Sequence, residues 1–373
     1  MNRKSTLQLL FVLLALVLVI AACQPAPETP TVEDPTEVVE EPFKVAFVYV
    51  APIGDLGWTW AHDQGRLDLE REFGDMLETS YIENVPEGPE AERVIRDYAQ
   101  RGYDLVITTS FGFMDPTIEV AKEFPDKWFV HISGYKTADN VSTVFGRMYQ
   151  PRYLSGIVAG KMTMNGNIGY VAAFPSPEVV RSINAFTLGV RSVNPEAKVT
   201  VRWTNTWDDP VKEREAAIAL LDAGADIIAQ HQDSTEPQKA AQERGALSIG
   251  YNSDMRPFVG DTVLTSPVWN WGQYYIATVQ AALDGTWVTH QYWEGLGAGV
   301  VHLADFSAKV PPDVRNLVET AQRQIIRNDR IFCGPIRDQA GNQLVGAGEC
   351  LSDADKLNMQ FFVEGVVGTI PND

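Results

Sequence analysis

Apolar residues follow two regular spacings along the chain from position 44 onward. Short runs rich in β-branched and aromatic residues predict strands at 44–50, 77–83, 105–109, 128–133 and 141–146. Between them, apolar residues at helical spacing predict helices at 58–73, 88–101 and 116–124. This alternation is typical of βαβ units, which build a parallel sheet.

The alternation restarts after a helix predicted at 152–164. Strands are expected at 168–173, 199–204, 227–230, 247–251 and 263–268, and helices at 177–193, 210–223 and 236–244. Two such series of about 100 residues each predict an α/β protein with two doubly wound parallel-sheet lobes. A helix at 271–283, a strand-like stretch at 287–306 and an amphipathic helix at 314–326 follow. They imply three crossings between the lobes, and therefore a multi-strand hinge about which the lobes close on a ligand.

The first 43 residues follow a different pattern. Arg3 and Lys4 precede an apolar run from Leu9 to Ile20, which indicates an export signal and is too short for a comfortable membrane-spanning helix. The sequence VIAAC at 19–23 resembles the lipobox of bacterial lipoproteins, which implies cleavage before Cys23 and lipidation of that residue. The alternative is a plain secreted protein with a stray cysteine. The Pro- and Glu-rich stretch that follows is typical of a tether.

These patterns divide the chain into five parts. Residues 1–22 are the signal peptide, and 23–43 are the lipidated cysteine and the tether. The N-terminal lobe comprises 44–147 plus about 267–286, and the C-terminal lobe 148–266 plus about 287–310. Residues 311–373 form a C-terminal helix and tail. The expected location is the outer face of the cytoplasmic membrane, or the periplasm.

Composition narrows the class of partner. The chain is 45% hydrophobic, enough for cores of ordinary size, and its 49 acidic against 30 basic residues give a net charge of -19. Such an excess of negative charge opposes a nucleic acid or an acidic lipid surface as partner. Contact with the membrane is therefore expected through the lipid anchor only, and a small neutral or cationic ligand fits better.

Motifs for catalysis, cofactors and metals are absent from the sequence. The turn after the first strand lacks G-x-G-x-x-G, and there is no P-loop, HExxH or GxSxG. None of the five histidines is spaced from another like a metal-binding pair. His231 follows a predicted strand and is more often a hydrogen-bonding residue than a base. We therefore expect neither enzyme activity nor a cofactor or metal.

The loops that follow the strands contain aromatic residues beside amides and carboxylates. Ligands of open α/β sheets bind outside the carboxyl ends of the strands, so these loops converge on the expected cleft. Each aromatic could instead cap the core, and each Asp could cap a helix. The candidate ligand-binding residues are Trp58, Trp60, Asp63, Phe111, Phe113, Phe174, Gln232, Asp233, Asn252, Asp254, Asn270 and Trp271.

Several segments together resemble the basic membrane protein (Bmp) family, the substrate-binding lipoproteins of ABC importers. The resemblance runs from about Lys44 to Ile370 and rests on the order and spacing of segments rather than on one motif. It implies a type I periplasmic binding protein fold, a purine held between aromatic rings of two lobes, and ABC permease and ATPase subunits as partners of a monomeric receptor. The segments are Thr109–Phe113, 119–126, 140–142, 153–160, 189–195, 253–254 and 283–287.

Two departures from the family pattern concern the ligand. Asn252 stands where the resemblance implies a ribose-binding Asp, and the stretch from Trp269 to Trp271 stands where it implies a Lys. Amides and indoles favour a free base such as adenine over a nucleoside. The alternatives are a purine-sensing receptor for a membrane signalling protein and an exported purine hydrolase using Asp63 or Asp233 as base.

Two further cysteines, Cys333 and Cys350, flank a Gly-rich stretch that reads as a returning loop. Because an exported protein meets an oxidising environment, we expect a disulfide between them. The alternative is two unpaired thiols.

Overall fold

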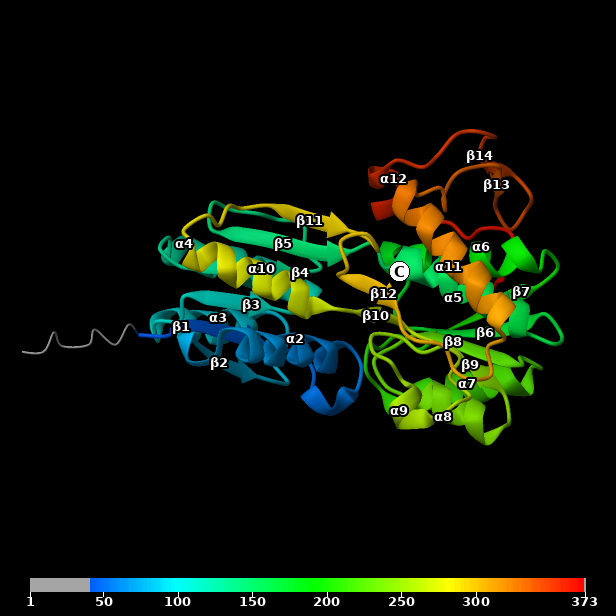
Figure 1. Ribbon diagram of the computed structural model, residues 1–373, viewed down its shortest axis with the longest axis horizontal. Helices are drawn as coiled ribbons and strands as arrows, with labels where there is room; N and C mark the ends of the chain where they lie inside the picture. The colour runs from blue at the N-terminus through cyan, green and yellow to red at the C-terminus, as the bar shows by residue number, and fades with distance from the viewer. Residues whose placement is uncertain (1–40, 372–373) are drawn as a thin grey trace, which may run out of the picture. The chain divides into compact units, whose positions relative to one another are not determined.

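Strands and helices alternate along the chain. The strands form two parallel sheets, one in each of two lobes (Figure 1). The computed structural model describes residues 41–371. The export signal at 1–22, the lipidation site Cys23 and nearly all of the tether lie outside these residues. Within 41–371, no helix is both apolar and long enough to span a membrane. The predicted α/β class with two parallel-sheet lobes is confirmed.

Six parallel strands form the sheet of the N-terminal lobe. Their spatial order is β11 (Gln291–Glu294), β5 (Val141–Gly146), β4 (Trp128–Ile132), β3 (Leu105–Thr108), β1 (Phe43–Val48) and β2 (Leu77–Ile82). Four helices accompany this sheet, namely α2 (Trp58–Phe73), α3 (Pro89–Gln100), α4 (Met114–Glu123) and α10 (Trp271–Leu283).

Strand β1 shows why this sheet is covered on both faces. Alternate residues of a strand point to opposite faces. Val45 and Phe47 belong to the core cluster that includes α2 and α10, whereas Ala46 and Val48 belong to the cluster that includes α3 and α4. A continuous apolar strand is therefore stable only between two helical layers.

The C-terminal lobe has a five-stranded sheet of the same kind. Its order is β15 (Val366–Val367), β7 (Lys198–Trp203), β6 (Asn167–Ala172), β8 (Ile227–His231) and β9 (Leu247–Ser248), all parallel. Its helices are α5 (Tyr149–Met162), α6 (Pro177–Val193), α7 (Pro210–Asp222), α8 (Glu236–Glu243), α9 (Arg256–Val259) and α11 (Pro312–Arg327).

The chain crosses between the lobes three times, as predicted. The crossings follow β5, β10 (Pro267–Trp269) and β11, and the last returns through β12 (Val301–Leu303), which pairs antiparallel with β10. Backbone hydrogen bonds tie the crossings together, from Arg147 to Glu294 (2.7 Å) and from Asn270 to Val300 (2.9 Å). The three segments therefore form one multi-strand hinge.

Part of the expected lobe assignment is wrong. The stretch 287–306 contains two strands, and the first, β11, pairs with β5 in the N-terminal sheet rather than with the C-terminal lobe. The expected strand at 263–268 is represented by β10, which belongs to the hinge pair. Pairing of parallel strands depends on distant segments, which a local pattern does not reveal.

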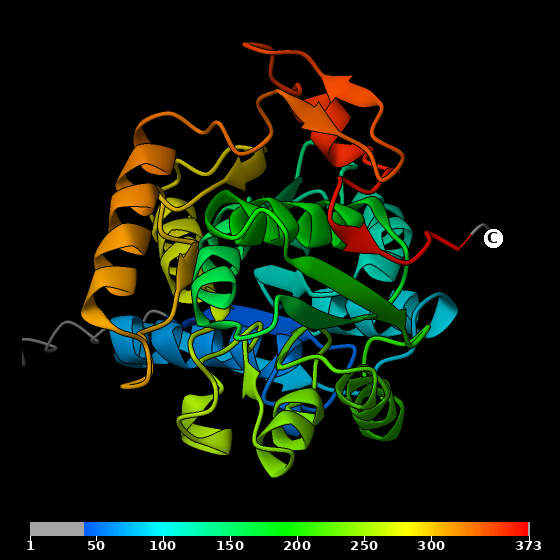
Figure 2. The ribbon, with the colours of Figure 1, turned by 90° about the vertical axis from the view of Figure 1, so that its right-hand side faces the viewer.

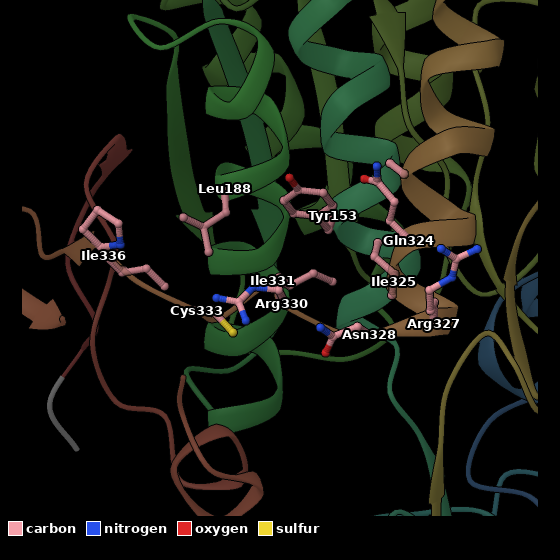
Figure 3. Close-up of a pocket in the computed structure, with 12 residues that line it drawn as sticks. Tyr153, Leu188, Gln324, Ile325, Arg327, Asn328, Arg330, Ile331, Cys333 and Ile336 are labelled. Carbon is pink, nitrogen blue, oxygen red and sulfur yellow. The ribbon is translucent and has the colours of Figure 1, made fainter. Parts of the chain in front are cut away.

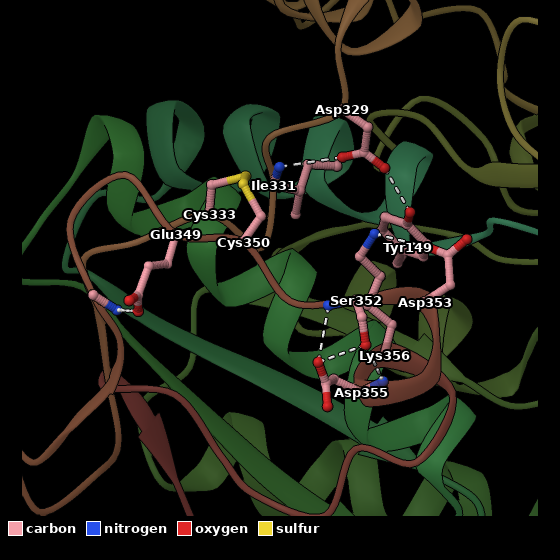
Figure 4. The surroundings of a disulfide bond; sticks show 11 residues. Tyr149, Asp329, Ile331, Cys333, Glu349, Cys350, Ser352, Asp353, Asp355 and Lys356 are labelled. Carbon is pink, nitrogen blue, oxygen red and sulfur yellow. Dashed lines mark hydrogen bonds and ion pairs between the residues drawn. A yellow bond between two sulfur atoms is a disulfide. The ribbon is translucent and has the colours of Figure 1, made fainter.

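The tail after α11 folds back onto the C-terminal lobe, and in Figure 2 its orange and red segments lie against the green helices. It comprises the hairpin β13 (Ile336–Arg337) and β14 (Gln343–Val345), α12 (Asp353–Leu357) and β15. A disulfide joins Cys333 to Cys350 (Figure 4), and Asp353 is paired with Arg147 at 2.7 Å.

Glycines set the distance between α5 and α6. A Cβ on Gly156 would lie 2.1 Å from the Phe186 carbonyl oxygen, and one on Gly189 would lie 2.0 Å from the Tyr153 carbonyl oxygen. Both contacts are with backbone, which cannot rotate away. The two helices can therefore pack this closely only with glycine at these positions.

Replacing Gly156 with Ala should destabilise the C-terminal lobe by about 1–3 kcal/mol, because the added methyl group overpacks a rigid interface. Gly297 is a suitable control, since a Cβ there would meet only Ile326 at an ordinary 3.5 Å. Thermal unfolding followed by circular dichroism compares the two variants. Equal midpoints for Gly156→Ala and Gly297→Ala would contradict the packing argument.

Candidate ligand-binding site

The turn between β1 and α2 is held by one carboxylate. Asp55 lies in the short 3₁₀ helix Ile53–Asp55, and its Oδ1 accepts from the backbone nitrogens of Gly57 (2.8 Å) and Trp60 (2.9 Å). Its Oδ2 accepts from that of Thr59 (2.8 Å). The first N–H groups of a helix have no partner within it, so this carboxylate completes the start of α2.

This turn is in direct contact with the C-terminal lobe. A Cβ on Gly57 would lie 1.9 Å from the backbone oxygen of Asp233, so only glycine allows the two chain segments to approach this closely. Beside this contact, Ser253 Oγ donates to the backbone oxygen of Leu56 at 2.5 Å. The lobes are therefore closed on each other at the turn.

A chain of hydrogen bonds leads from this contact to the hinge. Asn252, fully buried and with a φ of 64°, donates through Nδ2 to Asp233 Oδ1 at 2.8 Å. Its Oδ1 accepts from Trp269 Nε1 at 3.1 Å. Asn252 thus links Asp233 to the hinge residue Trp269, and its expected contact with the ligand stays a prediction.

Carboxylates from both lobes gather where the lobes meet. Burial, followed by the charges of Asp55, Glu213 and Asp208, raises the pKa of Asp233 well above its ordinary value. Burial raises the pKa of Asp55 to about 6 against the opposing effect of its backbone donors. Closing the lobes therefore brings together acids that resist being ionised together.

Glu213, on α7, belongs to this group although sequence reasoning did not select it. It is fully buried and accepts from the Ser234 hydroxyl and from the Asp209 backbone nitrogen. Burial raises its pKa to about 7, although these hydrogen bonds lower it.

Trp58 lies at the centre of an aromatic cluster next to the hinge. Its ring meets those of Trp269 and Trp271 edge-on, each at 5.7 Å, and its Nε1 donates to the Thr109 backbone oxygen at 2.6 Å. Trp271 is sandwiched between Trp269 and His62, each at 4.5 Å, and is fully buried. Both faces of Trp271 are covered, so the expectation that it forms a wall of the cleft is corrected.

A second aromatic group lies at the carboxyl ends of the C-terminal strands. Phe174, which follows β6, lies 5.3 Å from Trp207 between ring centroids, and Trp207 lies 6.3 Å from His231. His231 in turn lies 4.5 Å from Tyr251. Trp207 is 40% exposed, which makes it an open aromatic surface at this edge of the sheet.

Sequence reasoning missed Trp207 and Tyr251. Trp207 follows β7 in a segment rich in Thr, Asn and Asp, the same composition that marked the selected loops. That signal could have identified it. Tyr251 stood at the end of an expected strand and carried no such signal.

Other selected residues are engaged within the protein. Phe113 is fully buried in the core between the N-terminal sheet and its helices α3 and α4, so the expectation that it stacks on a ligand is corrected. Asp63 pairs with Arg66 at 2.7 Å, and Asp254 pairs with Arg256 at 2.6 Å. Gln232 is buried and donates to Thr204. Asp63 and Asp254 are thus paired without a ligand, whereas Oε1 of Gln232 has no hydrogen-bonding partner among the described residues.

The remaining selected residues are partly or largely exposed. Phe111 is 56% exposed beside Tyr135, at 6.4 Å between ring centroids. Trp60 meets Phe258 of the other lobe edge-on at 5.9 Å. Asn270 is half-buried in the hinge. The selected residues thus lie on both sides of the contact between the lobes.

Of two cavities in the structure, one is lined by selected ligand residues and the other is not. One of about 300 Å³ at the hinge is lined by Trp60, Asp254 and Trp269 together with His302 and Asp305. Another of about 510 Å³ lies between α5, α6 and α11, near Tyr153 and Ile325 (Figure 3). The second contains none of the selected ligand residues. Within 41–371, no three His, Cys, Asp or Glu side chains are placed to hold a metal ion.

Comparison with protein families identifies the family that has this architecture. The family model of the Bmp proteins, described as ABC transporter substrate-binding protein PnrA-like, matches residues 43–332. The chain belongs to the Bmp family. Substrate-binding proteins of ABC transporters act outside the cytoplasm, where they bind small molecules and deliver them to permease components.

Two curated Bmp relatives are similar over most of their length. A purine-binding protein of Brucella abortus (strain 2308) is 48% identical over 333 residues, which cover 89% of this chain and 95% of that protein. A putative ABC transporter glucose-binding protein of Haloferax volcanii is 44% identical over 335 residues, covering 89% and 82%. The family and these relatives are solute-binding proteins.

Solved structures confirm the fold of this Bmp protein. A solute-binding protein from Aeropyrum pernix K1 superposes with a TM-score of 0.69 at 19% identity, covering 80% of this chain and 93% of that one. One from Conexibacter woesei gives 0.66 at 24% identity, covering 77% and 97%. The fold is therefore that of type I periplasmic binding proteins, as the resemblance implied.

The raised pKa of Glu213 predicts a pH effect on stability. Its folded value of about 7 exceeds the ordinary 4.5, so the folded protein binds the extra proton and stability falls as pH rises between these values. Glu213→Gln removes this titration, and the wild-type protein should lose stability relative to the variant from about pH 5 to 8. Urea unfolding across this range measures the difference. Parallel pH profiles would contradict the assignment.

Proposed function

We propose that this ABC substrate-binding protein is a lipid-anchored receptor that binds a purine base, adenine or a close analogue, between its lobes. The observation that carries the proposal is the Phe174–Trp207 pair, partly exposed at the carboxyl ends of β6 and β7. Ligands of such sheets bind at this edge. Stacking of a base on an aromatic ring contributes about 1–3 kcal/mol.

The polar surroundings favour a ligand that donates hydrogen bonds. The neighbouring loop carries Asp233, whose backbone nitrogen donates to the Trp207 backbone oxygen at 3.2 Å. A carboxylate accepts from N–H groups, which purine bases provide on the ring and, in adenine, on the amino group. The purine-binding name of the Brucella relative supports the same ligand class.

Lipid anchoring and the importer partners complete the proposal. The lipobox-like sequence at 19–23 supports attachment through Cys23, outside the described residues. Permease and ATPase subunits would receive the ligand, as membership of the family suggests. A receptor in this role binds its ligand without converting it.

Isothermal titration calorimetry with adenine, adenosine and D-glucose tests the ligand. We expect adenine to bind most tightly, and replacing Phe174 with Ala to weaken it about 10- to 100-fold through lost stacking. Phe43→Ala is the matched control, because Phe43 pairs with Trp128 at 5.9 Å at the amino end of β1, away from the ligand edge.

Several outcomes would refute the proposal. Glucose binding without purine binding would assign the sugar class suggested by the name of the Haloferax relative. Equal loss in the Phe174 and Phe43 variants would remove the stacking role. Conversion of adenosine to base and ribose by the purified protein would favour the hydrolase alternative.

Replacing Cys23 with Ser should abolish lipid attachment, because no thiol is left to carry the diacylglycerol. Fractionation of cells expressing each form, with metabolic labelling by a fatty acid, measures this directly. A Cys23→Ser protein that is still labelled and sediments with membranes would contradict lipid anchoring.

A further inference from the structure

A group of buried polar side chains includes His231, whose ring centroid lies 6.3 Å from that of Trp207. Arg152 comes from the first turn of α5, Tyr170 from β6, and Gln230 and His231 from the end of β8. All four are at most 2% exposed. Because α5 leads directly into β6 and packs beside α6, its first turn lies at the carboxyl end of that strand.

Each member of this group has at least one polar atom without a hydrogen-bonding partner among the described residues. The atoms are Nε and Nη2 of Arg152, Oη of Tyr170, Oε1 of Gln230 and Nδ1 of His231. A buried polar atom left without a partner is destabilising, so several in one place indicate a site that another molecule completes.

Glu178 determines which ring nitrogen of His231 carries the proton. Nε2 of His231 lies 3.2 Å from Glu178 Oε1. Burial lowers the pKa of His231 to about 4, so the ring is neutral at pH 7. Burial alone would raise the pKa of Glu178, but the hydrogen bond from His231 and the charges of Arg181 and Arg152 lower it below its ordinary value. Nε2 therefore carries the proton toward Glu178, and Nδ1 is left as an acceptor.

Arg152 supplies donors in a fixed position. Its Nη1 donates to the Gln230 backbone oxygen at 2.6 Å, and its guanidinium lies 3.7 Å from the centroid of the Tyr251 ring. Tyr251 also contacts His231, at 4.5 Å between centroids. Arg152 and His231 thus contact the same ring, that of Tyr251, and both carry unpaired polar atoms.

We propose that His231 and Arg152 form the specificity contact for the edge of the bound ring: His231 Nδ1 accepts from an N–H of the ligand, and Arg152 donates to a neighbouring acceptor atom. This inference rests on the proposed function. The ring would enter beside Trp207, whose ring centroid lies 6.3 Å from that of His231. The ligand class is a flat heterocycle with a donor beside an acceptor.

Adenine offers three such edges: the N9 hydrogen with N3, the 6-amino group with N7, and the 6-amino group with N1. 9-Methyladenine lacks the N9 donor, and hypoxanthine lacks the amino donor that the other two edges share. These two probes therefore distinguish the N9 edge from the edges of the amino group. If the N9 edge enters, a ribose at that position is excluded, which would explain selection of a base over a nucleoside.

Two substitutions distinguish the roles of the two ring nitrogens of His231. His231→Gln keeps a donor toward Glu178 but lacks the Nδ1 acceptor, whereas His231→Asn places an amide oxygen near the position of Nδ1. His290→Gln is the control, because His290 precedes the amino end of β11 and bonds to Tyr274. Thermal unfolding verifies that each variant is folded.

Calorimetry with adenine, 9-methyladenine and hypoxanthine measures the affinity of each variant for each ligand. In the wild-type protein, one analogue should bind about tenfold or more weakly than adenine. In His231→Gln that penalty should shrink to less than about threefold, and in His231→Asn and His290→Gln it should persist. Arg152→Lys should weaken adenine binding, because a point charge cannot replace the guanidinium fork.

The outcomes separate this inference from the proposed function. An unchanged penalty in a folded His231→Gln protein overturns the inference and leaves purine binding intact. Equal affinity of the wild-type protein for all three ligands also overturns the inference and leaves purine binding intact. Failure of the wild-type protein to bind any of them overturns the proposed function, and the inference with it.

Discussion

The close approach of Gly57 to the backbone of Asp233 determines how the two lobes meet. Backbone contacts this short exclude every side chain, so the separation of the lobes at this point is set by the absence of a Cβ. Asp55 holds the turn that presents Gly57 by accepting three backbone hydrogen bonds. The start of α2 and the closure of the lobes therefore depend on the same carboxylate.

This closure has an electrostatic consequence. Bringing Asp55 beside Asp233 buries two acids from different lobes, and each shift in pKa is dominated by burial rather than by the neighbouring charge. Opening the lobes would rehydrate both groups, so closing is coupled to proton uptake or to a ligand that donates hydrogen bonds in their place. A neutral ligand rich in N–H groups fits such a site better than an anion.

The elements that local pattern determines were predicted well. Strand β1 is apolar from Val45 to Val48 because both its faces are buried there, and the sequence shows this directly. The placement of β11 was not predicted, since its pairing with β5 joins segments about 150 residues apart. Periodicity identifies a strand but does not identify its neighbour in a sheet.

The candidate site was predicted less completely, for a similar reason. An aromatic residue after a strand looks the same in sequence whether it is open, like Trp207, or sandwiched between two rings, like Trp271. Asn252 was read as a ligand contact because a family comparison places a ligand-binding acid there. The structure shows that its amide links Trp269 to Asp233. Only three-dimensional hydrogen bonding separates a residue that touches the ligand from one that positions it.

In the proposed site, the two lobes would contribute different kinds of group to binding. On the N-terminal side, Trp58 is held by a hydrogen bond and by the rings of Trp269 and Trp271, so its position is fixed by the hinge. On the C-terminal side, Arg152 and His231 carry buried polar atoms without hydrogen-bonding partners among the described residues. A rigid wall on one lobe and an unsatisfied polar wall on the other would allow hinge closure to be driven by the ligand, because only a bound ring with the right edge pairs the buried atoms. Selectivity and closure would then have one physical cause, the cost of leaving these atoms unpaired.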